Sequence, residues 1–88
     1  MFDTSEIYIN DRKRFSCISI FVNEKISKYL EGLLLQVVRS IDFNIDITAK
    51  GKSLIIDSPS KELTVTAVEY VNKALTDPKI IEKLKIFL

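Results

Sequence analysis

The stretch SIDFNIDITAKGKSLIID, residues 40–57, decides the fold. Its apolar and polar side chains alternate with the two-residue period of a strand that buries one face. The apolar positions are Ile41, Phe43, Ile45 and Ile47, and the polar positions are Asp42, Asn44, Asp46 and Thr48. Gly51 can adopt the positive φ that a tight turn requires, and residues 53–57 then return as the partner strand. The stretch therefore predicts a β-hairpin.

A helix is expected on each side of this hairpin. Before it, residues 24–39 carry apolar side chains at helical spacing, and the side chain of Asn23 can cap the first turn. After it, the run 63–71 is ambiguous, because its β-branched residues favour a strand while its spacing fits one helical face. The preceding Pro59 suits the first turn of a helix. We predict a helix here and keep the strand as the alternative.

The remaining segments extend this pattern at both ends. Residues 7–9 and 15–22 predict a first hairpin, because both are rich in β-branched and aromatic side chains and a polar, basic turn separates them. Asp77 and Pro78 can begin a short amphipathic helix at the C-terminus. A right-handed crossover after the first long helix leaves a gap that the last strand fills. The three main strands are thus expected in the order first, third, second.

The predicted fold class is α+β, a two-layer sandwich in which helices cover one face of an antiparallel sheet of three to four strands, in the order (β)βαββα(α). At 88 residues the chain is expected to form a single α/β domain, residues 1–88. Its core unit is 15–76. Residues 1–14 add a strand and a basic turn, and residues 77–88 add the short helix.

Composition limits the chemistry that the chain can perform. There is one cysteine, Cys17, and no histidine, which excludes an internal disulfide and removes the commonest general base and zinc ligand. The net charge of +1 gives no global attraction to polyanions. No apolar run approaches the ~20 residues that cross a bilayer, and the N-terminus does not resemble a secretion signal. We expect a cytoplasmic protein without membrane contact.

Candidate catalytic or metal-binding residues have simpler interpretations. Asp42, Asp46 and Asp57 could bind a hard metal or act as an acid/base pair, but four residues along one strand separate the first two by ~13 Å. A solvated sheet face explains them better. Cys17 could be a nucleophile, yet it lies in an apolar strand with no histidine to activate it, which favours packing. We predict no catalytic residue, no metal site and no cofactor.

The basic residues fall in two loops, and both could contact phosphates or be ordinary charged turns. They are Arg12, Lys13 and Arg14 in the first turn and Lys50 and Lys52 beside Gly51. These loops are expected at opposite ends of the sheet, so that only a dimer would join them into one patch.

Apolar helix surface exceeds what one small sheet can cover, and we interpret it as an interface with another chain. The Ile26–Leu30–Leu33–Val37 face and the Leu63–Ala67–Tyr70–Ala74 face would form the core or a docking surface, and Leu35 and Val65 project away from them. The predicted partner interface comprises Tyr29, Leu33, Leu35, Val65, Tyr70, Leu84 and Phe87.

From residue 15 to 76 the chain resembles the small dimerising subunit of the KEOPS complex, the Pcc-type family. The matching segments are AKGKSLIIDSP, residues 49–59, and AVEYVNKAL, residues 67–75, which includes the pair Val71 and Asn72. Two departures stand out. Val68 occupies a position where the family usually has arginine, and the N-terminal strand is additional. Both would suit a divergent paralogue that pairs with a standard subunit.

The resemblance implies a non-catalytic subunit that forms a homodimer or a heterodimer with a related subunit and docks its helices on the KEOPS catalytic subunit. That complex transfers a threonylcarbamoyl group to adenosine in tRNA, and ATP and metal would belong to the partners. A tRNA contact through the basic loops stays open. The alternative is an independent RNA-binding module resembling a KH domain, although the Gly-x-x-Gly loop that clamps nucleotides in that fold is lacking.

Overall fold

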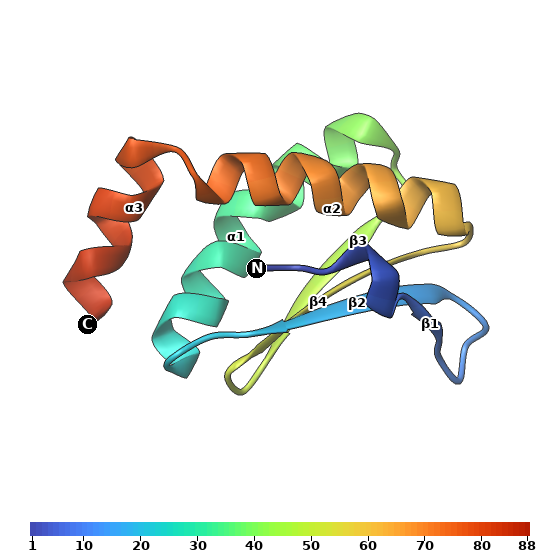
Figure 1. The fold of residues 1–88 in the computed structure, drawn as a ribbon, viewed down its shortest axis with the longest axis horizontal. Helices are drawn as coiled ribbons and strands as arrows, with labels where there is room; N and C mark the ends of the chain where they lie inside the picture. The colour runs from blue at the N-terminus through green and yellow to red at the C-terminus, as the bar shows by residue number, and fades with distance from the viewer.

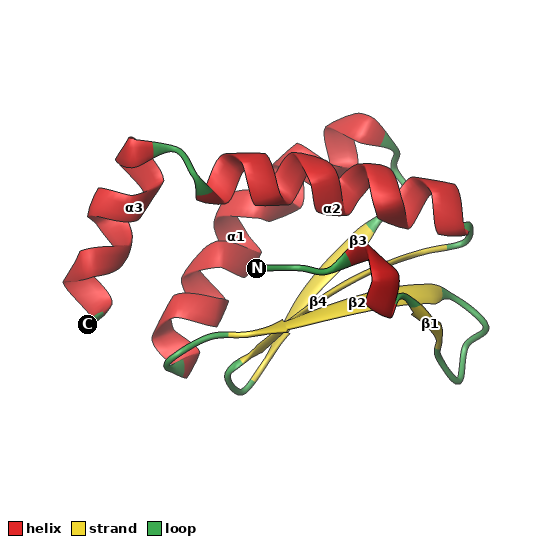
Figure 2. Cartoon of the chain, viewed as in Figure 1, coloured by secondary structure: helices red, strands yellow, loops and turns green.

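The computed structural model describes all residues from 1 to 88, and it places two long helices on one side of a four-stranded antiparallel sheet, with a short third helix beyond the end of the sheet (Figure 1, Figure 2). The strands are β1 (Tyr8–Ile9), β2 (Phe15–Ile20), β3 (Asp46–Lys50) and β4 (Ser53–Ser58). The helices are α1 (Glu24–Ile41), α2 (Lys61–Leu75) and α3 (Pro78–Leu84), with short 3-10 turns η1 (Thr4–Glu6) and η2 (Lys85–Phe87). The predicted α+β fold class is confirmed.

The sheet has the order β1-β2-β4-β3, and every neighbouring pair is antiparallel. β4 thus lies between the two strands that precede it, as the crossover argument predicted. The hairpin between β3 and β4 turns at Gly51, whose φ is +60°. In the turn between β1 and β2, Lys13 has a φ of 62°, a conformation that costs a side-chain-bearing residue more than it costs glycine.

Local capping explains where the helices begin. Asn23 accepts a hydrogen bond from Ile26 N at 3.0 Å and starts α1. Ser60 accepts one from Leu63 N at 3.2 Å and starts α2. The ambiguous run 63–71 is therefore helical, as predicted, because the cap and the apolar face outweigh its β-branched residues.

One hydrophobic core lies between the layers. Cys17, Leu54 and Ile56 rise from β2 and β4 and are fully buried under the helices. Buried polar groups fix α2 to the sheet beneath it: the Thr64 hydroxyl lies 2.7 Å from both Phe15 O and the Ser58 hydroxyl.

The first strand of the central hairpin is shorter than its alternation predicted. α1 continues to Ile41 and β3 begins only at Asp46, so that the predicted strand residues before it lie at the helix end and in the following turn. Phe43, expected on the core face, is 79% exposed. The sequence pattern here fits both structures. Ile41 lies three residues after Val38, and Ile45 lies four residues after Ile41, and this spacing also fits one face of a helix.

An N-terminal strap, residues 1–7, passes between α2 and β2 (Figure 1). The side chain of Phe2 is buried, and its backbone N–H and C=O bond to the Asn72 amide at 3.0 and 2.8 Å. Asp3 caps η1, and hydrogen bonds from the Ser5 hydroxyl and backbone N–H hold the pKa of this exposed carboxyl below its ordinary value. The strap completes the helical layer over β2.

Candidate interaction surfaces

The sheet face opposite the helices is bare, and much of it is apolar. Register places Ile18 of β2 beside Ile55 of β4, both on this open face. Ile20, at the same parity, is 74% exposed, and Val22 beyond the strand is 63% exposed. Tyr8 of β1, the partner of Ser16, faces the same way and is 44% exposed. We call this surface the open face.

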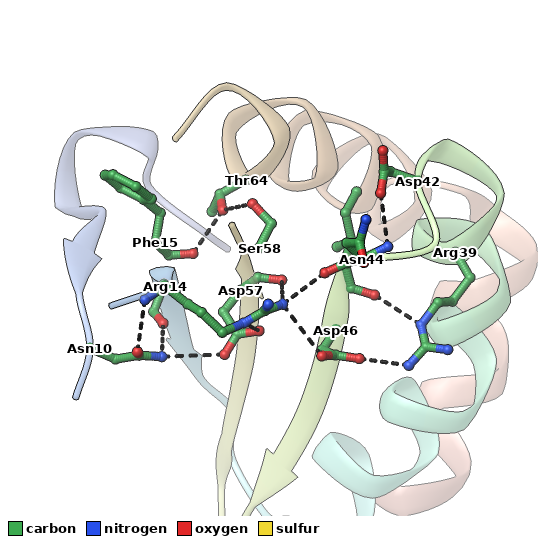
Figure 3. A network of polar contacts seen from close by, with 12 residues as sticks. Asn10, Arg14, Phe15, Arg39, Asp42, Asn44, Asp46, Asp57, Ser58 and Thr64 are labelled. Carbon is green, nitrogen blue, oxygen red and sulfur yellow. Dashed lines mark hydrogen bonds and ion pairs between the residues drawn. The ribbon is translucent and has the colours of Figure 1, made fainter. Parts of the chain in front are cut away.

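At one end of the open face, Arg14 joins three segments (Figure 3). Its Nε lies 3.1 Å from Asp57 Oδ1, and its Nη2 lies 3.4 Å from Asp46 Oδ2 and 2.7 Å from Asn44 O. Asp46 and Asp57 are direct partners on β3 and β4. Two carboxylates in such a position repel each other, and the guanidinium between them relieves this repulsion.

Arg39 at the end of α1 extends the same network. Its Nη2 lies 2.6 Å from Asp46 Oδ1, and its Nε donates to Ile45 O at 3.0 Å. The guanidinium also lies 5.3 Å from the centre of the exposed Phe43 ring, a cation–π contact. The network therefore attaches the C-terminal end of α1 to the edge strand β3.

The predicted basic loops lie at opposite ends of the sheet, since β2 begins opposite Ser58 and ends opposite Ser53. Their side chains nevertheless approach one another on the open face. Arg12 and Lys50 line one shallow hollow of about 310 Å³, whose other lining residues include Tyr8 and Ile55. A dimer is thus not needed to bring these two cations to a common surface.

The five predicted phosphate contacts do not share one environment. Arg14 is engaged by Asp57 and Asp46, whereas no ion pair involves the exposed Arg12, Lys13, Lys50 and Lys52. Arg14 is consequently a structural residue, and the other four are the cations that remain available to a ligand.

Burial of Cys17 agrees with its predicted packing role, whereas a solvated sheet face does not describe the aspartates, since Asp46 and Asp57 pair with Arg14. The Cys17 thiol is fully buried and donates to Asp3 O at 3.3 Å, and burial raises the pKa of this thiol above its ordinary value. Asp42 lies at the end of α1 instead of on the strand and accepts from Asn44 N at 2.8 Å. No group of three or more histidine, cysteine, aspartate or glutamate side chains could hold a metal ion.

On the helical side, the predicted interface residues separate into two classes. Tyr29, Leu33 and Leu35 on α1 are half-buried and pack against the core, as do Leu84 and Phe87 near the C-terminus. Tyr70 is 56% exposed on the outer side of α2, and Val65 is half-buried there, beside a shallow hollow of about 470 Å³. Tyr70 thus does not share the core face with Ala67, contrary to the predicted grouping.

Leu35 does not project away from the core as predicted: it packs against the core, one turn after Glu31 on the flank of α1 that faces the edge of the sheet. Glu31 accepts a hydrogen bond from Ala49 N of β3 at 2.6 Å. Because the N–H of Ala49 donates to this carboxylate, it is not free to pair with a strand of another chain at the edge of the sheet. Addition of a further strand at β3 is accordingly disfavoured.

A C-terminal arm, residues 77–88, lies beside α1 (Figure 1). The ring centres of Phe87 and Tyr29 are 5.2 Å apart at an interplanar angle of 43°. Asn23 Nδ2 donates to Phe87 O at 2.9 Å. The arm therefore covers part of the apolar helix surface that the sequence assigned to another chain.

Two positions that carry or limit the KEOPS resemblance have clear structural roles. Asn72 holds the backbone of Phe2 in the strap. Val68, where the resemblance expects arginine, is fully buried in the core, where a charged side chain would need a partner.

The open-face residues Ile18 and Ile20 were not singled out from the sequence. β2 alternates between small and large side chains, and this pattern could have indicated the open face. The small side chains of Cys17 and Ser19 point toward the core, and the isoleucines point toward the open face.

Comparison with protein-family models, curated proteins and solved structures finds no match. No helix in the structure combines the length and the apolar character needed to span a membrane.

Proposed function

We propose that this chain is a non-catalytic interaction subunit that associates with a second copy of itself, or with a related subunit, through the open face. Within this proposal it works like the small subunit of the KEOPS tRNA-modification complex, which it resembles, and presents its helical side to a catalytic partner. The observation that carries the proposal is the exposed apolar surface at Ile18, Ile20 and Val22.

An antiparallel sheet with one solvated face usually presents polar side chains on that face. Here the centre of the open face is apolar, while charged groups lie toward its ends. An apolar centre with a polar rim is the usual arrangement of a protein interface. The Arg14 network holds β2, β3 and β4 together at one end, so the face is preorganised for docking.

The surroundings of the reactive groups support a non-catalytic role. Cys17 is buried with a raised thiol pKa, which keeps it protonated and weakly nucleophilic. The Asp46–Asp57 pair is neutralised by Arg14 and Arg39. Neither constellation presents a free base or nucleophile to a substrate.

Molar mass in solution, measured by sedimentation equilibrium, tests the proposal. We expect the wild-type chain to form a dimer and the Ile20→Glu variant to be a monomer, because the substitution would bury a charge against the apolar part of the interface. Ile86→Glu is the matched control, since Ile86 is as exposed but lies on the C-terminal arm. A wild-type chain that stays monomeric alone and mixed with a candidate KEOPS subunit would refute the proposal.

A second candidate function is RNA binding, and the hollow lined by Tyr8, Arg12 and Lys50 favours it. An aromatic ring near cations can stack a base while the cations contact phosphates, and here Asp11 and Asp57 also line the hollow. This function uses the same face and therefore competes with dimerisation. Salt-dependent titration with tRNA distinguishes the two: tight binding that is lost in an Arg12→Glu, Lys50→Glu double variant would support RNA binding and count against the dimer.

A further inference from the structure

The outer side of β2 lacks a strand partner over most of its length. The bond from Phe21 N to Lys52 O continues the ladder with β4 and fixes its pattern, in which odd-numbered residues of β2 exchange backbone bonds with β4. The N–H and C=O groups of Ile18 and Ile20 therefore point to the other side, where β1 pairs with only the first two residues of β2. No backbone bond from a turn or loop reaches Ile18, Ile20 or Val22. We call residues 18–22 the β2 edge.

The β2 edge also lacks the features that keep a strand from pairing with another chain. Residues 15–22, FSCISIFV, contain no charged residue, no proline and no glycine. Proteins usually protect an exposed edge with a charge, a proline or a bulge, because unpaired backbone groups are a template for another strand. The opposite edge of the sheet is protected in another way, since Glu31 accepts from Ala49 N of β3. The β2 edge is thus the open one of the two.

The β2 edge is complementary to itself. In an antiparallel pair of copies centred on Ile20, this residue exchanges both backbone bonds with Ile20 of the other copy. Ile18 then lies opposite Val22, and paired residues point to the same face of a sheet. The three apolar side chains that are exposed on the open face of each copy therefore meet in one row. A single symmetric contact provides partners for the backbone groups and covers these side chains.

The neighbouring elements leave room for this register. β1 pairs no further along β2 than Ser16. In each copy the chain leaves the β2 edge after Val22, because Asn23 caps α1. The strand of the other copy therefore ends opposite Ile18, before it would meet β1. The start of the helix and the short length of β1 together define a space for a short strand.

We propose that two copies of this chain associate edge to edge, with their β2 edges paired antiparallel about Ile20, so that the two four-stranded sheets join into one. Such a contact is isologous, the arrangement of most homodimers. This inference rests on the proposed function, since it uses the same exposed apolar residues. It adds that the partner is a second copy and that backbone bonds hold it.

Hydrogen exchange at single amides tests the pairing. In the monomer the amides of Ile18 and Ile20 have no strand partner, whereas in the dimer each donates to a carbonyl of the other copy. We expect their exchange to slow about ten-fold between a dilute sample and one in which about nine-tenths of the chains are dimeric, because exchange then requires dissociation. The amide of Ile9, which points outward from β1, is the matched control and should exchange equally fast in both samples.

Two substitutions at one position separate the backbone from the side chain. Ile20→Ala removes the side chain, and Ile20→Pro also removes the N–H, which points away from β4 and is not needed for that ladder. We expect the Ile20→Pro chain to dimerise about a hundred-fold more weakly than Ile20→Ala in sedimentation equilibrium. Two symmetric bonds are lost, and each contributes on the order of ten-fold. Protected amides of Cys17 and Ser19 verify that the ladder with β4 is intact; if Ile20→Pro does not fold, the exchange measurement decides alone.

The outcomes distinguish the two proposals. Unchanged exchange at Ile18 and Ile20 in a dimeric sample, or equal dimerisation of folded Ile20→Pro and Ile20→Ala chains, would overturn the edge pairing and leave a dimer that stacks face to face. A chain that is monomeric alone but binds a related subunit would also overturn it, because the occupant is then not a second copy. A chain that is monomeric alone and in such a mixture would refute the proposed function itself.

Discussion

The two ends of the chain both lie against the helical layer, but they are attached in different ways. The N-terminal strap buries Phe2 to 4% exposure and binds its backbone through both polar atoms of the Asn72 amide. The C-terminal arm has no fully buried residue: Ile80, Leu84 and Phe87 pack partly against the core, and one side-chain hydrogen bond holds Phe87 O. The strap is thus part of the core, whereas the arm is an accessory to it.

The sheet explains this difference. α1 packs mainly on β3, and α2 packs on β4 and β2, so two helices leave the β2 side of a four-stranded sheet incompletely covered. A domain of this size buries a smaller fraction of its surface on folding than a larger domain does, so each buried apolar side chain matters to its stability. Phe2 fills the remaining space beside Cys17, while the arm adds to a surface of α1 that is already half-buried.

The largest expected effect is at Phe2. Phe2→Ala removes a buried aromatic ring and should lower the free energy of unfolding by about 3 kcal/mol, toward the lower end of such truncations because a terminal segment can relax. Chemical denaturation measures this loss. Ile9→Ala is the control, since Ile9 is 61% exposed and should change stability little. Equal losses at the two positions would mean that the strap is not docked in solution.

A smaller effect is expected at Asn72. Asn72→Ala leaves the N–H and C=O of Phe2 without their partners, which should cost about 1–2 kcal/mol of unfolding free energy. The same variant should speed labelling of the Cys17 thiol, because the strap that covers it opens more often. Asn44→Ala is the matched control, since Asn44 makes its hydrogen bonds through the backbone. Unchanged thiol reactivity in Asn72→Ala would contradict the clamp.

Local signals in the sequence were enough to predict most of the fold. Gly51 marked the turn, Asn23 marked the start of the first long helix, and the crossover rule placed β4 between β2 and β3. The prediction was wrong at residues 41–45, where the alternation of a strand and the steps of three and four residues of a helix coincide. In the structure α1 continues to Ile41 and partly buries its side chain, and the strand does not begin there.

The candidate surfaces were harder to predict because their contacts are distant in sequence. Arg14 meets Asp57 across 43 positions, and Phe2 meets Asn72 across 70. A basic turn read by itself suggests a free cation, and only the strand register shows that Arg14 lies between two carboxylates. Likewise, the surplus apolar surface of α1 was read as an interface, and part of it is covered by the chain's own arm.

The smallest expected effect is at Phe87, where the same Phe→Ala change tests the other end of the chain. Phe87 is half-buried on a segment without buried residues, so Phe87→Ala should lower the global free energy of unfolding by about 1 kcal/mol or less. Hydrogen exchange should nevertheless show faster exchange at residues 78–88, with the amides of β2 and β4 unchanged. That combination separates an arm that opens locally from a strap that opens with the core. A loss at Phe87 as large as that at Phe2 would mean that the two ends of the chain are attached equally firmly.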